Sequence, residues 1–552
     1  MSEVVFDVRG LDTSEPATDI EPGRATTMQN LTVRDGGIQQ RPVLRSYPSI
    51  GSNVPMVSQV LGGAEIVSVT GVPRQVVSGT TNWAWFSDGS WSALSYVTAG
   101  GVSDPPSLST VQYWDIVQIY DPNSDEMIAV GAPGSHQSLY CWKSGSTLFS
   151  TLSTAPRAKY VAPYDNYLMA LNIRDPVSAN SIYVQRVQWS DRGDPSNWTA
   201  GLSGFEDLLD MRGAGTRIIA DGRRIVIFSD LEIWQGVTAN APFQFLFSAI
   251  DRGVGCPYPN TISQTPLGIM FLGNGNRIYL LPKDGGGARE IGQRVLVLLR
   301  DTHQIANAER AWSVYDSYTN TWRLYYRVNG SGPDYPVYAV WFHLDSGEWT
   351  SQRYNSYSVG GATSIPLTRG WAARVTTSSN GTEWDDSGFS GTWTWATVPF
   401  TWSQLAAATT YGPSTMFAGA STGSVYKEWS DVDYSIEDST LTLISRWQGA
   451  VVAQSVADNL KEVTEVGVDF ATPISIGTMV IGVGSNANPT QSYQEISTRG
   501  TAVENPRQLT AFVRATLRYP MVTLQSGNGG QTFPGKVRRL SVRFRVGGIR
   551  RD

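Results

Sequence analysis

The chain has 552 residues, which exceeds the size at which one hydrophobic core usually stops growing, so several domains or a repeat architecture are expected. Charged residues make up 16% of it, against about 25% in an ordinary soluble domain, whereas Trp (19), Tyr (24), Phe (17) and Gly (55) are abundant, which is typical of turn-rich β structure. The formal net charge of -6 argues against a protein that coats nucleic acid over its whole surface, so any contact with DNA must be local.

The first residues, MSEVVFDVRG, lack the basic stretch and apolar run of a signal peptide, and no segment approaches the roughly 20 apolar residues of a membrane-spanning helix. Cys141 and Cys256 are far apart and have no metal-site spacing, so two unpaired thiols are expected. We therefore expect a protein that is made inside a cell and has no membrane-spanning segment.

Three regions follow one another along the chain. Residues 1–46 are polar and interrupted by Pro and Gly, which predicts an extended arm that packs on another part of the protein, the terminal β domain. Residues 47–430 carry short apolar and aromatic runs separated by Gly, Ser, Asn and Asp clusters, which predicts many short strands joined by tight turns. Residues 431–552 contain longer alternating strands, which predicts a separate C-terminal β domain that forms the ring or tube.

The middle region is predicted to be a β-propeller. The runs WAWFSDGSW from Trp83, LYCWKSGST from Leu139 and VQWSDRGDPSNW from Val187 begin roughly 50 residues apart, the spacing of propeller blades. About six candidate blades can be placed at this period, the clearest over 311–349. Helix is expected to be a minor component, over 206–211 and 294–311. The stretch 360–420, rich in Thr, Ser, Trp and Gly, is either a blade or an insertion.

The most informative charge pattern is at the end of the chain. In a strand over 539–546, Arg539, Arg543 and Arg545 fall on one face and apolar residues on the other. A second strand, over 512–519, places Arg514 and Arg518 on one face in the same way. Two such strands predict a basic surface that either lines a DNA channel and engages phosphates without reading sequence, or serves as a subunit interface or solvated face.

No catalytic residue, metal site or cofactor is predicted. His136, His303 and His343 have no metal-ligand spacing to Cys, Asp or Glu, and neither a phosphate-binding loop nor a nucleophile elbow occurs. SDRGDPSNW, residues 190–198, is similar to the Asp-box turns of sialidase propellers, which are themselves structural. Glycan hydrolysis therefore stays an alternative to a non-enzymatic role.

Three segments in order resemble one protein family. The opening leads through Arg41 and Pro42 into LRSYPSI; the middle runs from VQWSDRGDPSNWT through IVIFSDLEIWQG to IDRGVGCPYPNTI and IMFLGNGNRIYLL; the end is KVRRLSVRFRV. The chain resembles the tail hub or packaged-DNA-stabilising proteins of short-tailed (podovirus) bacteriophages, which are related to tail nozzle proteins. The order of the three segments is more specific than any one of them.

The resemblance implies a virion protein without catalytic residues. It implies a six-bladed propeller with an additional β domain built from both ends of the chain, assembled as a homohexamer below the portal and head-tail adaptor ring. Such a ring continues and closes the DNA channel, contacts double-stranded DNA non-specifically, retains packaged DNA, conducts it at infection and bears tail fibres or spikes. The alternatives are a receptor- or carbohydrate-binding propeller at the tail tip and a cellular propeller scaffold.

Overall fold

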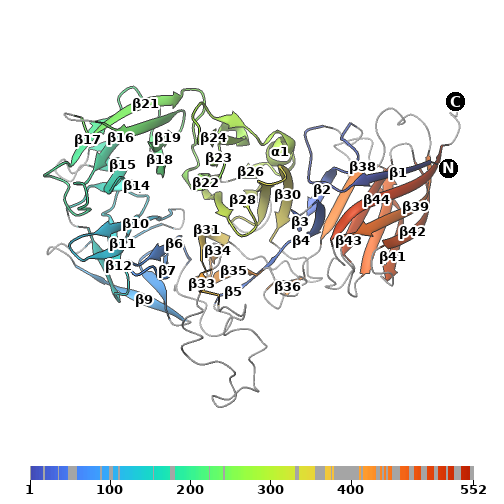
Figure 1. Cartoon of the computed structure of the whole chain (residues 1–552), viewed down its shortest axis with the longest axis horizontal. Helices are drawn as coiled ribbons and strands as arrows, with labels where there is room; N and C mark the ends of the chain where they lie inside the picture. The colour runs from blue at the N-terminus through green and yellow to red at the C-terminus, as the bar shows by residue number, and fades with distance from the viewer. Residues whose placement is uncertain are drawn as a thin grey trace, which may run out of the picture.

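The structure, a computed structural model, describes residues 2–15, 19–34, 36–47, 59–87, 90–98, 104–109, 112–152, 154–174, 181–222, 224–239, 243–306, 308–329, 335–354, 367–374, 376–377, 410–411, 415–429, 436–437, 441–442, 445–450, 461–471, 478–485, 494–502, 508–517, 520–526 and 536–546. They form two bodies, a large ring of sheets and a smaller pair of sheets that contains the strands nearest both chain ends (Figure 1). Strands dominate throughout, which confirms the all-β class.

The ring is a β-propeller whose first four blades follow one another along the chain. The first two blades are joined at their edges by parallel pairing of β9 with β13. The strands of the four blades are β6 (Gly62–Val67), β7 (Pro73–Ser78), β8 (Trp83–Ser87) and β9 (Ser90–Val97); β10 (Asp115–Asp121), β11 (Glu126–Ala132), β12 (Tyr140–Lys143) and β13 (Leu148–Thr151); β14 (Arg157–Tyr164), β15 (Tyr167–Arg174), β16 (Ile182–Trp189) and β17 (Gly204–Asp207); and β18 (Gly215–Asp221), β19 (Arg224–Ser229), β20 (Ile233–Thr238) and β21 (Phe245–Asp251).

Three further blades complete the propeller. They consist of β22 (Ser263–Thr265), β23 (Gly268–Leu272), β24 (Ile278–Pro282) and β25 (Arg289–Glu290); β27 (Trp312–Asp316), β28 (Thr321–Val328), β29 (Tyr338–His343) and β30 (Glu348–Arg353), with β26 (Ile305–Ala306) beside β28; and β31 (Leu367–Ala373), β34 (Thr415–Ala420), β35 (Val425–Trp429) and β5 (Val43–Ser46). The described residues thus contain seven blades, so the propeller is confirmed but the expected number of six is wrong.

The seventh blade closes the ring with strands from distant parts of the sequence. β5, placed in the arm by the sequence analysis, pairs with β35 and forms the outer strand of the last blade. On the other side, Trp371 of this blade packs on the first blade at Gly63, where a Cβ atom would lie 2.4 Å from the indole ring. Only glycine permits this close approach, so Gly63 sets the contact that joins the last blade to the first.

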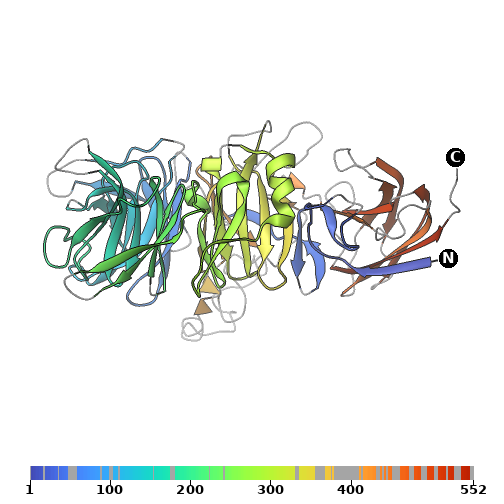
Figure 2. The same ribbon diagram turned by 90° about the horizontal axis from the view of Figure 1, so that it is seen from above.

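The smaller body is a two-sheet β domain made from both terminal regions (Figure 2). Each sheet combines strands of the N-terminal arm with strands from beyond residue 445, so the expectation of an additional terminal β domain is confirmed. The six-stranded sheet holds β1 (Ser2–Asp7), β3 (Leu31–Arg34), β4 (Gly37–Gln40), β39 (Lys461–Phe470), β42 (Gln508–Leu517) and β44 (Val537–Val546); the five-stranded sheet holds β2 (Ala25–Gln29), β38 (Arg446–Ala450), β40 (Thr478–Ser485), β41 (Gln494–Ala502) and β43 (Pro520–Ser526).

One hydrophobic core runs from this terminal domain into the propeller. It joins Val466 and Leu540 of the six-stranded sheet to Leu31 of the arm and to Trp322 and Trp349 of the sixth blade, all of them at most 1% exposed. A core shared in this way fixes the two bodies against each other.

The remaining elements are short. The predicted helix over 206–211 is wrong, because β17 ends at Asp207 and a turn follows. The expected helix over 294–311 is a single turn, α1 (Gln293–Val297), continued by the π-helical η3 (Leu298–Thr302). The other short elements are the 3-10 helices η1 (Pro259–Thr261), η2 (Asn274–Asn276) and η4 (Ala308–Arg310), and the strand pairs β32 (Thr376–Thr377) with β33 (Thr410–Tyr411) and β36 (Ile436–Glu437) with β37 (Leu441–Thr442).

Candidate functional site

The arginines at the end of the chain lie on the outer face of the six-stranded sheet. Arg539, Arg543 and Arg545 are exposed on β44, whereas Leu540 and Val542 are fully buried. The predicted amphipathic strand is therefore present. Its apolar side contributes to the shared core and its arginine side faces outward.

The second predicted strand belongs to the same sheet. Arg514 lies on β42 between the buried residues Val513 and Ala515, while Arg518 lies outside the described residues. β39 separates β42 from β44, so the two strands belong to one sheet without being neighbours.

The β44 arginines are flanked by acids on both sides. Arg543 stands between Glu3 of β1 and Glu465 of β39, with nitrogen–oxygen distances of 3.5 and 2.8 Å. Arg539 forms an ion pair of 3.0 Å with Asp7 of β1. The hydrogen bond that Arg543 donates to Glu465 raises the pKa of Arg543, so this guanidinium stays charged.

The remaining register positions repeat the pattern. Arg545 is opposite Glu462, and Arg539 has Asp469 on the side away from Asp7. A phosphate that approached these arginines would meet carboxylates within one strand spacing, which weakens the attraction that non-specific DNA binding requires. The geometry thus favours ion pairing as the role of this arginine row, and the pairs form within the chain.

Two large apolar side chains are exposed on this charged face. Val5 on β1 and Phe512 on β42 are 56% and 67% exposed. Phe512 extends the row that crosses the sheet through Glu3, Arg543 and Glu465. A charged, paired surface with an exposed aromatic residue at its edge resembles a protein interface more than a phosphate channel.

The turn that is similar to a sialidase Asp-box is held by its own carboxylates. Asp191 accepts hydrogen bonds from the backbone N–H of Leu202 at 2.8 Å and of Arg192 at 2.9 Å, and Asp194 accepts one from Ser196. These contacts use the Asp oxygens to stabilise a loop, as in an Asx turn. The turn accordingly has a structural role.

The three histidines are separate and engaged in local contacts. His136 bonds to Asn172 Oδ1 at 2.8 Å and His303 to the hydroxyl of Tyr326 at 2.7 Å. Burial lowers the pKa of His303 to about 4 and that of His343 to about 3. All three environments disfavour the charged form, so these residues are neutral at pH 7.

The cysteines and acids offer no metal centre among the residues that the structure describes. Cys141 and Cys256 are free thiols, and burial raises the pKa of Cys256 to about 12. Within the same residues, no helix has the length and apolar character needed to cross a membrane.

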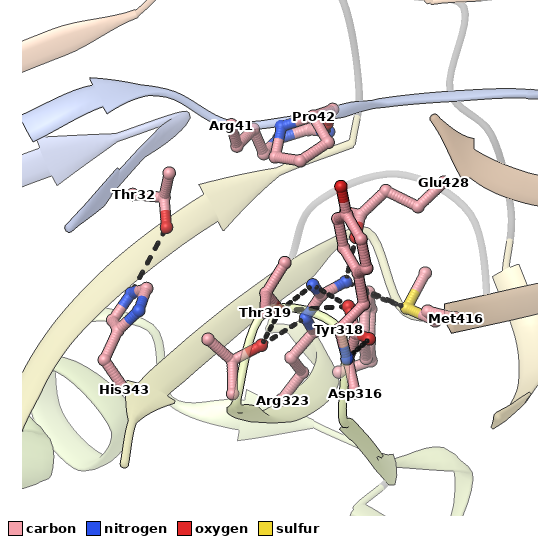
Figure 3. A network of polar contacts seen from close by, with 12 residues as sticks. Thr32, Arg41, Pro42, Asp316, Tyr318, Thr319, Arg323, His343, Met416 and Glu428 are labelled. Carbon is pink, nitrogen blue, oxygen red and sulfur yellow. Dashed lines mark hydrogen bonds and ion pairs between the residues drawn. The ribbon is translucent and has the colours of Figure 1, made fainter. Parts of the chain in front are cut away.

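A buried ion-pair network joins the sixth and seventh blades (Figure 3). Arg323 of β28 is fully buried and contacts Asp316 Oδ2 and Glu428 Oε2, each at 2.5 Å. Its guanidinium also lies 4.0 Å from the ring centre of Trp341. Glu428 comes from β35 next to the closing strand, so this network links ring closure to the blade before it.

The N-terminal arm contacts the same region of the sixth blade. Arg41, just before β5, donates to Asn30 Oδ1 at 3.3 Å and lies over the ring of Tyr354 at 4.1 Å. His343 approaches the hydroxyl of Thr32 at 3.4 Å. The sequence analysis did not identify this network, because its members are distant in the sequence.

The network predicts a dependence of stability on pH. Two carboxylates share one guanidinium away from water, and burial raises the pKa of Glu428 from 4.5 to about 7. The folded state therefore binds a proton that the unfolded chain has released, so its stability falls as pH rises from about 4.5 through about 7. We expect a loss on the order of 2–3 kcal/mol from this group, measured by urea unfolding at pH 5 and pH 8.

The matched variant for this measurement is Glu428→Gln. It keeps the shape of the side chain and removes the titrating group, so the difference in unfolding free energy between wild type and variant should change across this pH range. If that difference is constant from pH 5 to pH 8, Glu428 is ionised in both the folded and the unfolded state. Burial would then not raise its pKa into this range.

Sequence comparisons identify no family for the chain: no protein-family model matches it, and no curated protein matches its sequence. Solved structures match at low similarity. A fungal alcohol oxidase of the AA5 family in complex with copper covers 91% of this chain and 99% of its own at 10% identity and a TM-score of 0.38.

The Pan2 WD40 domain of Neurospora crassa covers 73% of this chain and 99% of its own at 7% identity and a TM-score of 0.34. An ancestral GH74 enzyme covers 83% of this chain and 53% of its own, at 10% identity and a TM-score of 0.35. Similarity at this level carries no argument about function.

Proposed function

We propose that the chain is a structural virion protein without catalytic activity, the tail hub or nozzle ring of a short-tailed bacteriophage. In this role copies of the chain form a homohexamer that contacts the portal or adaptor ring, continues and closes the DNA channel, and bears fibres or spikes. The proposal combines the ordered resemblance of three sequence segments with the two-body architecture.

The observation that carries the proposal is the outer face of the six-stranded sheet. It presents alternating rows of acids and arginines with Phe512 exposed at its edge. Rows of both signs suit a contact with another protein surface, where they set orientation and register. A closed ring needs such a contact between different faces of neighbouring copies.

Assembly of the purified chain tests this proposal. We expect a ring in mass photometry, and we expect Phe512→Glu to shift it towards the monomer because a new carboxylate would be buried beside Glu465. Val69→Glu, a change at a 52% exposed apolar residue of the propeller, is the matched control and should leave the ring intact.

Other outcomes would contradict the proposal. A wild-type chain that stays monomeric at all concentrations and is absent from purified particles would favour a cellular scaffold. Equal assembly of the Phe512→Glu chain and wild type would place the interface on another face.

Receptor binding is a second candidate, favoured by exposed apolar side chains on the third and fourth blades. Phe205 of β17 and Leu246 of β21 are each 55% exposed, and Phe243, just before β21, is 62% exposed. Exposed apolar side chains suit contact with a protein or glycan partner. Binding of the chain to host cells that is lost in Phe243→Ser would support this candidate, and turnover of a host polysaccharide would overturn the view that the chain has no catalytic activity.

A further inference from the structure

The innermost strands of the propeller bring three arginines to one end of the ring axis. Arg217 is the third residue of β18, Arg369 is the third residue of β31, and Arg310 lies two residues before β27. Tyr113 and Asp115 occupy the corresponding start of β10. Inner strands of a propeller run in the same direction, so their first residues gather at one mouth of the central channel.

One of the arginines, Arg217, forms an ion pair with a buried carboxylate. Asp115, which is 3% exposed, forms an ion pair of 2.8 Å with Arg217 Nη2 through one oxygen and accepts a hydrogen bond of 3.1 Å from the backbone N–H of Val161 through the other. Arg369 instead has a long contact of 3.4 Å to the carbonyl oxygen of Asn260. Arg217 and Arg369 together carry two positive charges, of which Asp115 balances one.

The surroundings of Arg369 show that this charge is poorly compensated. Burial, together with the nearby Arg217, lowers the pKa of Arg369 to about 10. Its guanidinium lies 5.9 Å from the ring centre of Tyr113, which offers a π face but no negative charge. Arg369 is nevertheless partly exposed, so solvent reaches it.

Hydrogen-bond donors without partners lie in the same cluster. Among the residues that the structure describes, neither the hydroxyl of Tyr113, which is 8% exposed, nor Nε of Arg217 has a hydrogen-bond partner. Buried donors are normally satisfied, and an unsatisfied one destabilises the folded state. Excess positive charge and unused donors at one place are complementary to an oxyanion.

We propose that the mouth of the propeller channel binds a phosphate-class oxyanion through Arg369, Arg217 and Tyr113. The guanidinium groups supply charge-assisted hydrogen bonds and the phenol a neutral one, while Asp115 holds Arg217 in place from the opposite side. The oxyanion is either free phosphate or the terminal phosphate of a nucleotide chain, since both present the same group. This site is independent of the proposed ring function.

Thermal unfolding of the full chain tests the proposal. At constant ionic strength, we expect the Tm of wild type to rise with sodium phosphate and to stay constant with sodium chloride, because a ligand that binds only the folded state stabilises it. Arg369→Gln should weaken phosphate binding by about tenfold or more and abolish the Tm rise. Without phosphate its Tm should be no lower than that of wild type, since a poorly compensated charge beside Arg217 has been removed.

A second variant and a second ligand make the result decisive. Tyr113→Phe removes the unpartnered hydroxyl, so it should keep the fold and weaken binding by a few fold. A short 5′-phosphorylated oligonucleotide tested against its unphosphorylated form separates the two sources of the group. Equal responses to phosphate and chloride, or a phosphate response that persists in both variants, would overturn the proposal.

Discussion

Replacing Arg323 with Met is expected to destabilise the propeller by about 3–5 kcal/mol, since it leaves Asp316 and Glu428 buried as two adjacent carboxylates without their shared partner. Both acids are at most 5% exposed, so water cannot solvate them in the folded state. Urea unfolding followed by tryptophan fluorescence measures the effect directly, because the guanidinium lies over Trp341.

The matched control is Arg192→Met. This arginine forms an ion pair of 2.9 Å with Asp165, but its side chain is 51% exposed, so its loss should cost less than about 1 kcal/mol. Two equal losses would show that the buried network contributes no more than a surface ion pair. The ring would then owe its closure mainly to the strand pairing of β5 and to apolar packing.

Deleting residues 1–40 is expected to unfold the terminal domain while leaving β5 in place to close the propeller. The deletion removes β1, β2, β3 and β4 and with them the core residues Leu11, Met28, Leu31 and Ile38, each at most 1% exposed. At about 1.5–3 kcal/mol for each buried side chain, the loss approaches the whole stability of a typical domain. Limited proteolysis should then cleave rapidly within residues 461–546.

A substitution on the exposed face of β1 is the control for this deletion, because it changes the surface of the terminal domain without removing any core residue. Val5→Thr alters β1 at a side chain that is 56% exposed and keeps the pairing with β44, so protease resistance should match wild type. If the deleted chain keeps its resistance over 461–546, the arm is an appendage and the terminal domain folds without it.

Local patterns in the sequence were enough to predict much of the fold. The alternation of Arg539, Arg543 and Arg545 with apolar residues correctly indicated which side of β44 faces outward. The blade over 311–349 was placed correctly, because tight turns and aromatic strands coincide there. Period-two alternation is imposed by neighbouring residues and can therefore be recognised without the fold.

Features that depend on distant residues were not predictable in this way. The composition of the seventh blade was not predicted, because this blade combines 43–46 with three strands spread over 367–429. The stretch 360–420, left open as a blade or an insertion, contains two strands of this blade, β31 and β34.

The sites depend on the same distant contacts. The acids beside Arg543 come from distant parts of the chain, at Glu3 and Glu465. The strand is basic in the sequence, but in the fold its arginines form ion pairs with acids of the neighbouring strands. The cluster around Arg369 likewise unites residues of four blades and the segment before a fifth, and no local motif marks it. A charged residue inside an aromatic strand, as Arg323 is in TWRLYYRV, was the one available signal of the buried network.

The most direct test of the proposed function is DNA retention by phage particles assembled without this chain. Our account predicts that such heads package DNA and then lose it, that adding the purified chain restores retention and infectivity, and that the monomeric Phe512→Glu variant does not. If the particles keep their DNA but fail to adsorb to the host, the chain binds a receptor or carries fibres instead, and the proposed closure of the channel is contradicted.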